Sequence, residues 1–207
     1  MLLIKPHHNS QKRFYGPDKI YFITTVTHRR FPFFKEDLFC DLFVENLRIC
    51  KELKKFKLYA FIIIPDHIHL LLKPGNNFNI SQIMHAIKRH FSRNANLAIV
   101  GQNDFIFDNE GEDCNPRLHL DVHNFNKNLI KYRQQFIIKY GNPQLEIPKF
   151  KWQKSFYDHV IRNEKDFLKH LNYIAFNCVK HKVCDNEEKY KWSNMNSDFN
   201  DFINDWQ

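Results

Sequence analysis

The chain contains few glycines and no paired cysteines. Its five glycines form no Gly-x-x-x-x-Gly-Lys-Ser/Thr loop, so the sequence lacks the phosphate-binding loop of P-loop enzymes. The five cysteines are odd in number and include no Cys-x-x-Cys pair, which favours reduced thiols over a disulfide framework. A zinc site built from Cys114, His119 and His123 is conceivable. Its spacing fits no common zinc template, so loop and helix-surface positions are the better interpretation.

Long apolar runs are also missing. Residues 1–13 lack the apolar segment of a signal peptide, and no uninterrupted apolar run approaches the length of a membrane span. We therefore expect a cytoplasmic protein with no membrane partner.

Hydrophobic and aromatic residues are abundant. They make up 43% and 15% of the 207 residues, with 21 phenylalanines, which indicates a folded protein with a substantial core. The net charge is +8, and residues 185–207 carry −4 of charge, which leaves +12 on residues 1–184. A basic body of this size suits a polyanionic partner, most simply nucleic acid. The acidic end could be a solvated tail or could fold back over the basic surface.

Alternating hydrophobic patterns predict an α+β domain. We expect a strand at 20–27, a helix at 36–55, a hairpin at 59–74, a helix from residue 80, a strand at 156–161 and a helix from Asn163 to about Val179. This order predicts a ferredoxin-like antiparallel sheet with helices on one face. We place a single domain at 15–184, interrupted by an insertion at about 94–150 that carries an acidic loop and one extra helix. An acidic C-terminal tail follows at 185–207.

The hairpin carries two histidines on one face. Side chains alternate along a strand, so His67 and His69 project together while Ile68 and Leu70 point to the other face. Two neighbouring imidazoles resemble half of a metal site. The alternative is a pair of surface histidines on a half-exposed strand.

The last helix carries a tyrosine on its polar face. Tyr173 falls nearly opposite the apolar stripe, with Asn177 one turn further along the same face and His170 nearby. An ordinary surface tyrosine is the alternative. Beside a divalent cation, however, a phenol can attack a phosphodiester in line and displace a 3′-hydroxyl. Two imidazoles and an oxygen ligand such as that of Asn177 would hold Mg²⁺ or Mn²⁺ and leave positions open for phosphate oxygens.

Basic residues follow the first strand and lie along the second helix. Phosphate contacts and a solvated basic face are both consistent with their positions, and we name them as candidate DNA-binding residues: Arg29, Arg30, Lys88, Arg89 and Arg93.

Several motifs together resemble a known family. The sequence is similar to REP-associated tyrosine transposases, a branch of the single-tyrosine HUH (insertion-sequence type) transposases. The matching segments are 26–30, 65–72, 157–162 and 173–180, with a weaker match at 192–193. The resemblance implies an HUH endonuclease domain that nicks and rejoins single-stranded hairpin DNA through a covalent 5′-phosphotyrosine intermediate. It also implies that Tyr173 is the nucleophile and that His67, His69 and Asn177 are the metal ligands, with His170 a weaker candidate. We expect His159 near the site and assign it no role.

The chain departs from the family pattern at several positions. Asp66 stands where the family usually has Asn, Cys178 replaces the usual Pro, Lys182 replaces a common Gly, and segment 94–150 is longer than usual. None of these changes removes a predicted catalytic group. Two alternatives stay open: a non-catalytic binder of structured single-stranded nucleic acid, and a phosphodiesterase that uses water. The sequence leaves the choice between monomer and homodimer open as well.

Overall fold

The computed structural model describes residues 16, 18–100, 134–141 and 148–206. The strands are β1 (Tyr21–Val26), β2 (Lys57–Ile64), β3 (His67–Lys73) and β4 (Tyr157–Val160). The main helices are α1 (Asp37–Lys54), α2 (Ile80–Val100), α4 (Glu164–Ala175) and α5 (Asn177–Lys180). Each strand and helix predicted within 18–100 and 148–206 is present. The last predicted helix is broken at Phe176 into α4 and α5.

The four strands form one antiparallel sheet in the order β2-β3-β1-β4. With α1 between β1 and β2, and α2 between β3 and β4, this is the ferredoxin-like arrangement expected from the sequence. The central strand β3 pairs with β1 so that Thr24 faces His69 and Val26 faces His67. Both predicted histidines therefore lie on an interior strand of the sheet.

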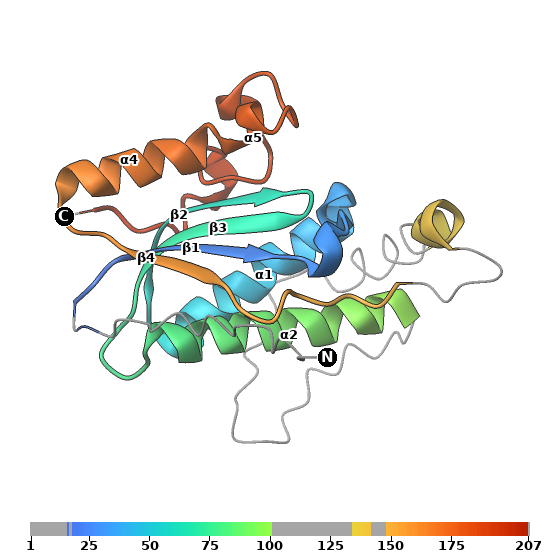
Figure 1. Cartoon of the computed structure of the whole chain (residues 1–207), viewed down its shortest axis with the longest axis horizontal. Helices are drawn as coiled ribbons and strands as arrows, with labels where there is room; N and C mark the ends of the chain where they lie inside the picture. The colour runs from blue at the N-terminus through green and yellow to red at the C-terminus, as the bar shows by residue number, and fades with distance from the viewer. Residues whose placement is uncertain (1–15, 17, 101–133, 142–147, 207) are drawn as a thin grey trace, which may run out of the picture.

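Helices cover both faces of the sheet (Figure 1). The expectation of helices on one face holds for α1 and α2, which pack with Ile68, Leu70 and Leu72 in the larger core cluster. It is wrong for α4 and α5, whose Ile174 and Cys178 pack on the other face. The reason lies in the strands themselves, because β2 is almost continuously apolar and both β2 and β3 are buried on both sides.

The second helix is longer than the sequence pattern indicated. Helix α2 continues to Val100, beyond the predicted boundary at residue 94. Residues 134–140 are helical, as predicted for part of the insertion, and Phe136 packs against Phe33 and Phe39 in the core. The zinc-site alternative of Cys114, His119 and His123 and the acidic loop lie outside the described residues.

The C-terminal segment packs against β2 and α1. Backbone amides of Ile63 and Asn194 donate to the carbonyls of Trp192 and Phe61, at 2.9 and 3.0 Å. Phe202 is buried, and the guanidinium of Arg48 lies 4.2 Å from the centre of its ring. Of the two alternatives for the acidic end, residues 185–206 therefore fold back, and they cover an edge strand that would otherwise be open to pairing. Among the described residues, no helix is both long and apolar enough to span a bilayer.

Candidate active site

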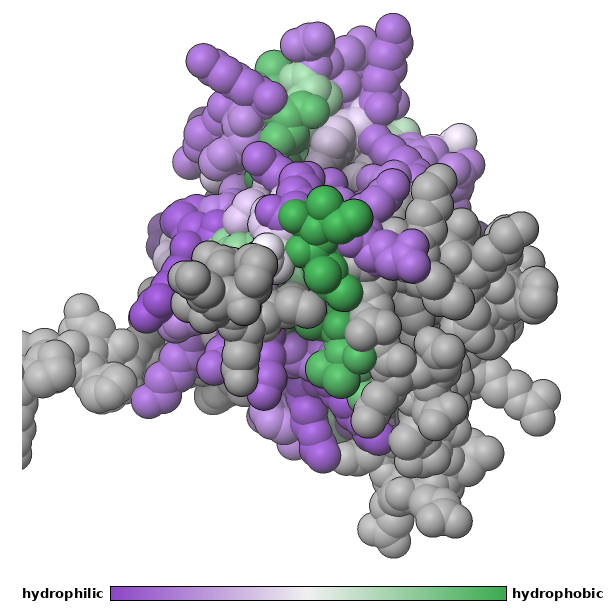
Figure 2. All heavy atoms as spheres, turned by 90° about the vertical axis from the view of Figure 1, so that its right-hand side faces the viewer, coloured by the Kyte–Doolittle hydropathy of each residue, from purple (hydrophilic) through white to green (hydrophobic). Residues whose placement is uncertain are grey.

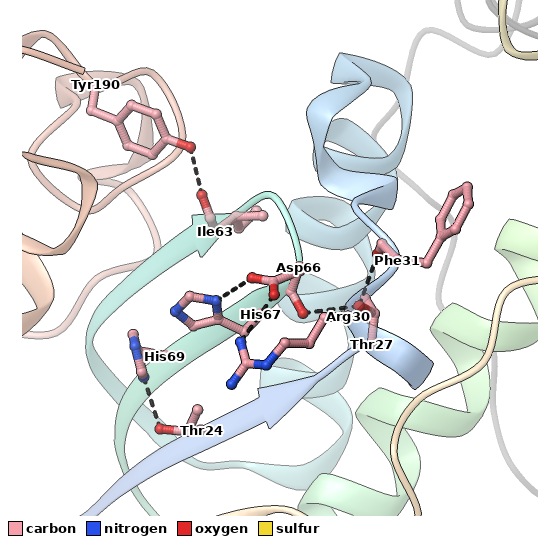
Figure 3. Close-up of polar contacts among 9 residues, drawn as sticks. All are labelled: Thr24, Thr27, Arg30, Phe31, Ile63, Asp66, His67, His69 and Tyr190. Atoms are coloured by element: carbon pink, nitrogen blue, oxygen red, sulfur yellow. Dashed lines mark hydrogen bonds and ion pairs between the residues drawn. The ribbon is translucent and has the colours of Figure 1, made fainter. Parts of the chain in front are cut away.

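The two histidines lie together on the sheet face that α4 covers. The ring centres of His67 and His69 are 4.9 Å apart, and both residues are almost fully buried. His67 opens β3 directly after the Pro65-Asp66 turn, and His69 follows two residues later on the same face. The prediction that this pair shares one face is therefore confirmed, and the pair is buried rather than exposed (Figure 3).

Asp66 connects His67 to a basic residue. One carboxylate oxygen of Asp66 lies 2.6 Å from Nδ1 of His67, and the other lies 2.9 Å from a guanidinium nitrogen of Arg30 (Figure 3). Burial opposes ionisation of Asp66, but the hydrogen bonds with His67 and Arg30 outweigh it and lower the pKa. A carboxylate that accepts from Nδ1 leaves Nε2 of His67 as the ring nitrogen that can bind a cation.

His69 is held in a complementary way. Its Nδ1 lies 2.8 Å from the Thr24 hydroxyl, whereas its Nε2 is buried and finds no hydrogen-bond partner in the described part of the chain. Burial, reinforced by the neighbouring His67 and by the positive charge of Lys180, lowers the pKa of His69 to about 3. The ring is therefore neutral at physiological pH, which is the form that binds a metal.

Tyr173 approaches this pair from helix α4. Its ring centre is 5.2 Å from that of His69 and 5.7 Å from that of Phe22, and the residue is 37% exposed. The ammonium group of Lys180 lies 4.8 Å from the centre of the tyrosine ring. Tyr173 is thus both open to solvent and next to a buried histidine, and the Lys180 ammonium lies within cation–π distance of its ring.

Asn177 is fully buried, yet neither its amide nitrogen nor its amide oxygen has a hydrogen-bond partner among the residues that the structure describes. It lies one turn after Tyr173 and four residues before His181, whose ring centre is 4.8 Å from that of His67. Because both of these neighbours contact the histidine pair, Asn177 lies along the same side of the chain. A buried amide without partners is costly, and such groups are concentrated at functional sites.

His170 and His159 belong to a different cluster. Their ring centres are 4.7 Å apart, and both contact Asp166. Asp166 also donates its backbone N–H to Asn163, the predicted helix cap. The structure therefore places His170, the weaker candidate for a third ligand, with His159 rather than with His67 and His69.

The candidate DNA-binding residues fall into two groups. Arg29 and Arg30 follow β1 at the turn end of the hairpin, near His67, and both have positive φ (55° and 53°). The described residues at this end of the molecule present a mostly hydrophilic surface, crossed by a narrow hydrophobic strip (Figure 2). Lys88, Arg89 and Arg93 lie on α2, which packs on the opposite sheet face, and Lys88 donates to the carbonyls of Gln153 and Ser155.

Three neighbours of the histidine pair were not found from the sequence: Thr24, Phe22 and His181. Thr24 and Phe22 depend on the register of β1 against β3, which no local pattern encodes. His181 had a usable signal, because it lies eight residues after Tyr173 and four after Asn177, at helical spacing.

The chain is similar to known proteins over most of its length. Residues 18–103 match the family model described as "Transposase IS200 like". A Haemophilus influenzae protein named "Putative REP-associated tyrosine transposase" is 27% identical over 191 residues, which cover 92% of this chain and 87% of the relative. A solved structure of a REP-associated tyrosine transposase bound to a REP hairpin matches 95% of this chain and 89% of its own, with a TM-score of 0.58 and 18% identity. The resemblance inferred from the sequence is confirmed, and so is the α+β class with its antiparallel four-stranded sheet.

Proposed function

Because the chain is a relative of the REP-associated tyrosine transposases, we propose that it nicks and rejoins single-stranded DNA that contains hairpins. Tyr173 is the nucleophile, and His67, His69 and Asn177 hold Mg²⁺ or Mn²⁺. The observation that carries the proposal is the 5.2 Å contact between the rings of Tyr173 and His69, because it joins a solvent-accessible phenol to a buried histidine whose Nε2 has no partner.

The residues present fit a divalent cation. Nε2 of His69 and the amide oxygen of Asn177 are buried polar atoms without partners, and each is a group that can ligate a metal. Asp66 orients His67 through Nδ1, as carboxylates commonly do for histidine ligands. Two nitrogens and one amide oxygen would leave coordination positions for phosphate oxygens.

The chemistry exchanges one phosphodiester for another. A bound ion supplies charge withdrawal from the scissile phosphate. The Tyr173 oxygen attacks phosphorus, the bond from phosphorus to the 3′-oxygen breaks, and the 3′-oxygen leaves as a hydroxyl with the proton that the phenol loses. The 5′ end is then esterified to Tyr173, and a second 3′-hydroxyl reverses the step to join a new strand. No nucleotide cofactor is consumed, because a phosphodiester is present at each stage.

Basic residues would hold the DNA on either side of the site. Arg29 and Arg30 lie near His67, so we assign them to the phosphates next to the scissile bond. Lys88, Arg89 and Arg93, on the far sheet face, would contact a more distant part of the hairpin. Replacing one Lys or Arg that contacts a phosphate should make the slope of log affinity against log salt concentration less steep by about one.

The second candidate function is a non-catalytic binder of structured single-stranded nucleic acid. The basic body and the hairpin-bound neighbour would be explained by either function, so affinity does not separate them. The unpartnered atoms of His69 and Asn177 favour the enzyme, because a binder gains nothing from burying them. The proposed reaction can be carried out by a monomer or by a homodimer. We place the protein in the cytoplasm.

A covalent-trapping assay tests the proposal. The protein is incubated with labelled single-stranded hairpin DNA and Mn²⁺ or Mg²⁺, then denatured and examined for label on the polypeptide. We expect a metal-dependent adduct that is absent in Tyr173→Phe and in His67→Ala. Tyr157→Phe is the matched control, because Tyr157 is an exposed tyrosine on β4.

Other outcomes favour the alternatives. Cleavage that survives Tyr173→Phe without an adduct would indicate water as the nucleophile. Binding without cleavage across a broad panel of hairpins would indicate the non-catalytic binder.

A further inference from the structure

A cluster on β4 and α4, outside the proposed active site, brings together two histidines and a carboxylate. His159 comes from β4, and Asp166 and His170 come from α4, four residues apart. Nε2 of His159 lies 2.9 Å from one Asp166 oxygen, and Nδ1 of His170 lies 3.2 Å from the other. One ligand atom from each residue can be chosen so that all three lie within 4.8 Å of one another. The 2.9 Å between Nε2 of His159 and the Asp166 oxygen is a separation of neighbouring ligands around one metal ion. Nδ1 of His170 donates to Asp166, so His170 would bind the ion through Nε2.

The surrounding contacts fix these side chains. Nδ1 of His170 lies 2.8 Å from the backbone carbonyl of Asp166, which can only accept, so Nδ1 carries the proton and Nε2 has the free lone pair. The backbone N–H of Arg162 donates to Asp166 at 3.1 Å. The rings of His159 and His170 stack with an angle of 22° between their planes. Such support of ligands by outer contacts is typical of metal sites.

The cluster borders a cavity of its own. A pocket of about 480 Å³ lies beside it and is lined by the cluster and by Arg162, Lys165 and Lys169. All three cluster residues are partly buried, so they are reachable from the pocket without being freely solvated. The pocket therefore offers space for a further ligand, and its basic rim favours an anionic one.

We propose that His159, Asp166 and His170 form a second metal site, selective for a transition-metal ion such as Zn²⁺, with an open coordination position toward the basic pocket. Two imidazoles and one carboxylate suit Zn²⁺ and its neighbours better than Mg²⁺, which prefers oxygen ligands and retains water. On binding, the hydrogen bond between His159 and Asp166 is replaced by two coordination bonds, and the His159 proton moves from Nε2 to Nδ1 or is released. An anion such as a phosphate oxygen completes the coordination.

The site is separate from the proposed catalytic one, although the two share a neighbour. Phe22 lies between them, with its ring centre 4.7 Å from that of His170 and 5.2 Å from that of His69. An ion that links β4 to α4 would stabilise the helix that carries Tyr173. The inference does not depend on the transferase activity, because it rests only on the residues of the cluster.

The test uses Co²⁺, whose visible absorption reports direct coordination, on chelator-treated protein. The parent protein for this test is the His69→Ala variant, which lacks a proposed metal ligand of the catalytic site. Further substitutions are added to it. We expect the parent to bind one Co²⁺ with a visible absorption band and a rise in melting temperature. Adding Asp166→Asn or His159→Gln weakens this binding at least about tenfold. The matched controls Glu164→Gln and His85→Gln, both exposed and outside the cluster, leave it unchanged.

A second measurement tests the proposal without the His69→Ala substitution, in case that variant does not fold. In the otherwise unaltered chain, Asp166→Asn should reduce by one the number of Zn²⁺ ions retained after gel filtration. The proposal is overturned if a folded parent binds no Co²⁺, if Asp166→Asn and His159→Gln leave the band unchanged, or if the number of retained Zn²⁺ ions is the same with and without Asp166→Asn.

Discussion

Asp66 Oδ1 lies 2.6 Å from Nδ1 of His67, and this contact links a carboxylate to a histidine that is almost fully buried. The other carboxylate oxygen is held by Arg30. A charged acceptor fixes the tautomer of the ring and makes Nε2 a better donor to a metal. We therefore expect Asp66→Asn, which keeps an acceptor but loses the charge, to weaken Mn²⁺ binding about tenfold.

Calorimetric titration with Mn²⁺ measures this effect. Asp18→Asn is the matched control, because Asp18 is an exposed carboxylate that also pairs with a cation, Lys73. Equal Mn²⁺ affinity in Asp66→Asn and the unaltered protein would contradict the role given to Asp66.

Replacing Asn177 should affect the stability of the metal-free protein and the stabilisation by Mn²⁺ in opposite ways. Its buried amide has no partner, so replacing it with an apolar side chain of similar size removes a desolvation cost. We expect Asn177→Leu to raise the free energy of unfolding of the metal-free protein by about 1 kcal/mol. The same change should abolish the rise in melting temperature that Mn²⁺ produces.

Asn46→Leu is the matched control, because Asn46 is also buried but donates to the carbonyl of Ile87 at 3.1 Å. We expect that variant to be destabilised. Chemical denaturation with and without Mn²⁺ measures both variants, and a destabilised metal-free Asn177→Leu would show that the amide is structural.

The C-terminal segment contributes to stability. Phe202 is 5% exposed and contacts Phe61 on β2. We expect Phe202→Ala to lower the free energy of unfolding by about 3–5 kcal/mol, as for other large core truncations. Thermal unfolding measures the loss against Met195→Ala, an exposed residue of the same segment. A similar melting temperature for the two variants would mean that the segment is a solvated tail.

Asp41 should make stability depend on pH. Burial, with a contribution from the charge of Asp37, raises its pKa to about 6, although Lys191 opposes the shift. A raised pKa means that the folded state holds the proton more tightly, so its contribution is favourable at low pH and is lost as pH rises from about 4 through 6. We expect Asp41→Asn to gain about 1 kcal/mol over the unaltered protein between pH 4 and pH 7, after allowance for solvent screening. Denaturant titrations of both proteins at several pH values measure the difference, and a constant difference would contradict it.

The elements were predicted from local patterns, but the packing of helices on both sheet faces was not. Hydrophobic spacing predicted α1, α2 and the hairpin, because helix and strand periods are local properties of the chain. The second helical layer was missed, although the unbroken apolar run of residues 58–64 in β2 was a signal that both faces are covered.

In the candidate site, too, local patterns were predictable and contacts between distant segments were not. Strand alternation was sufficient to place His67 and His69 on one face, and helical spacing linked Tyr173 to Asn177. Their convergence depends on α4 packing over β3, a contact between segments about a hundred residues apart, and only the family resemblance suggested it. The pairing of Asp66 with His67 and Arg30 depends on side-chain positions that no periodicity encodes.

The most direct measurement is the identity of the residue that carries the DNA. The protein is reacted with a single-stranded hairpin in the presence of Mn²⁺, the DNA is digested to a short remnant, and the peptides are sequenced by mass spectrometry. The chain has eight tyrosines, so the assignment is discriminating. We expect the nucleotide remnant on Tyr173, joined through a 5′-phosphate. A remnant on another residue, or efficient cleavage with no modified peptide, would contradict the proposed mechanism.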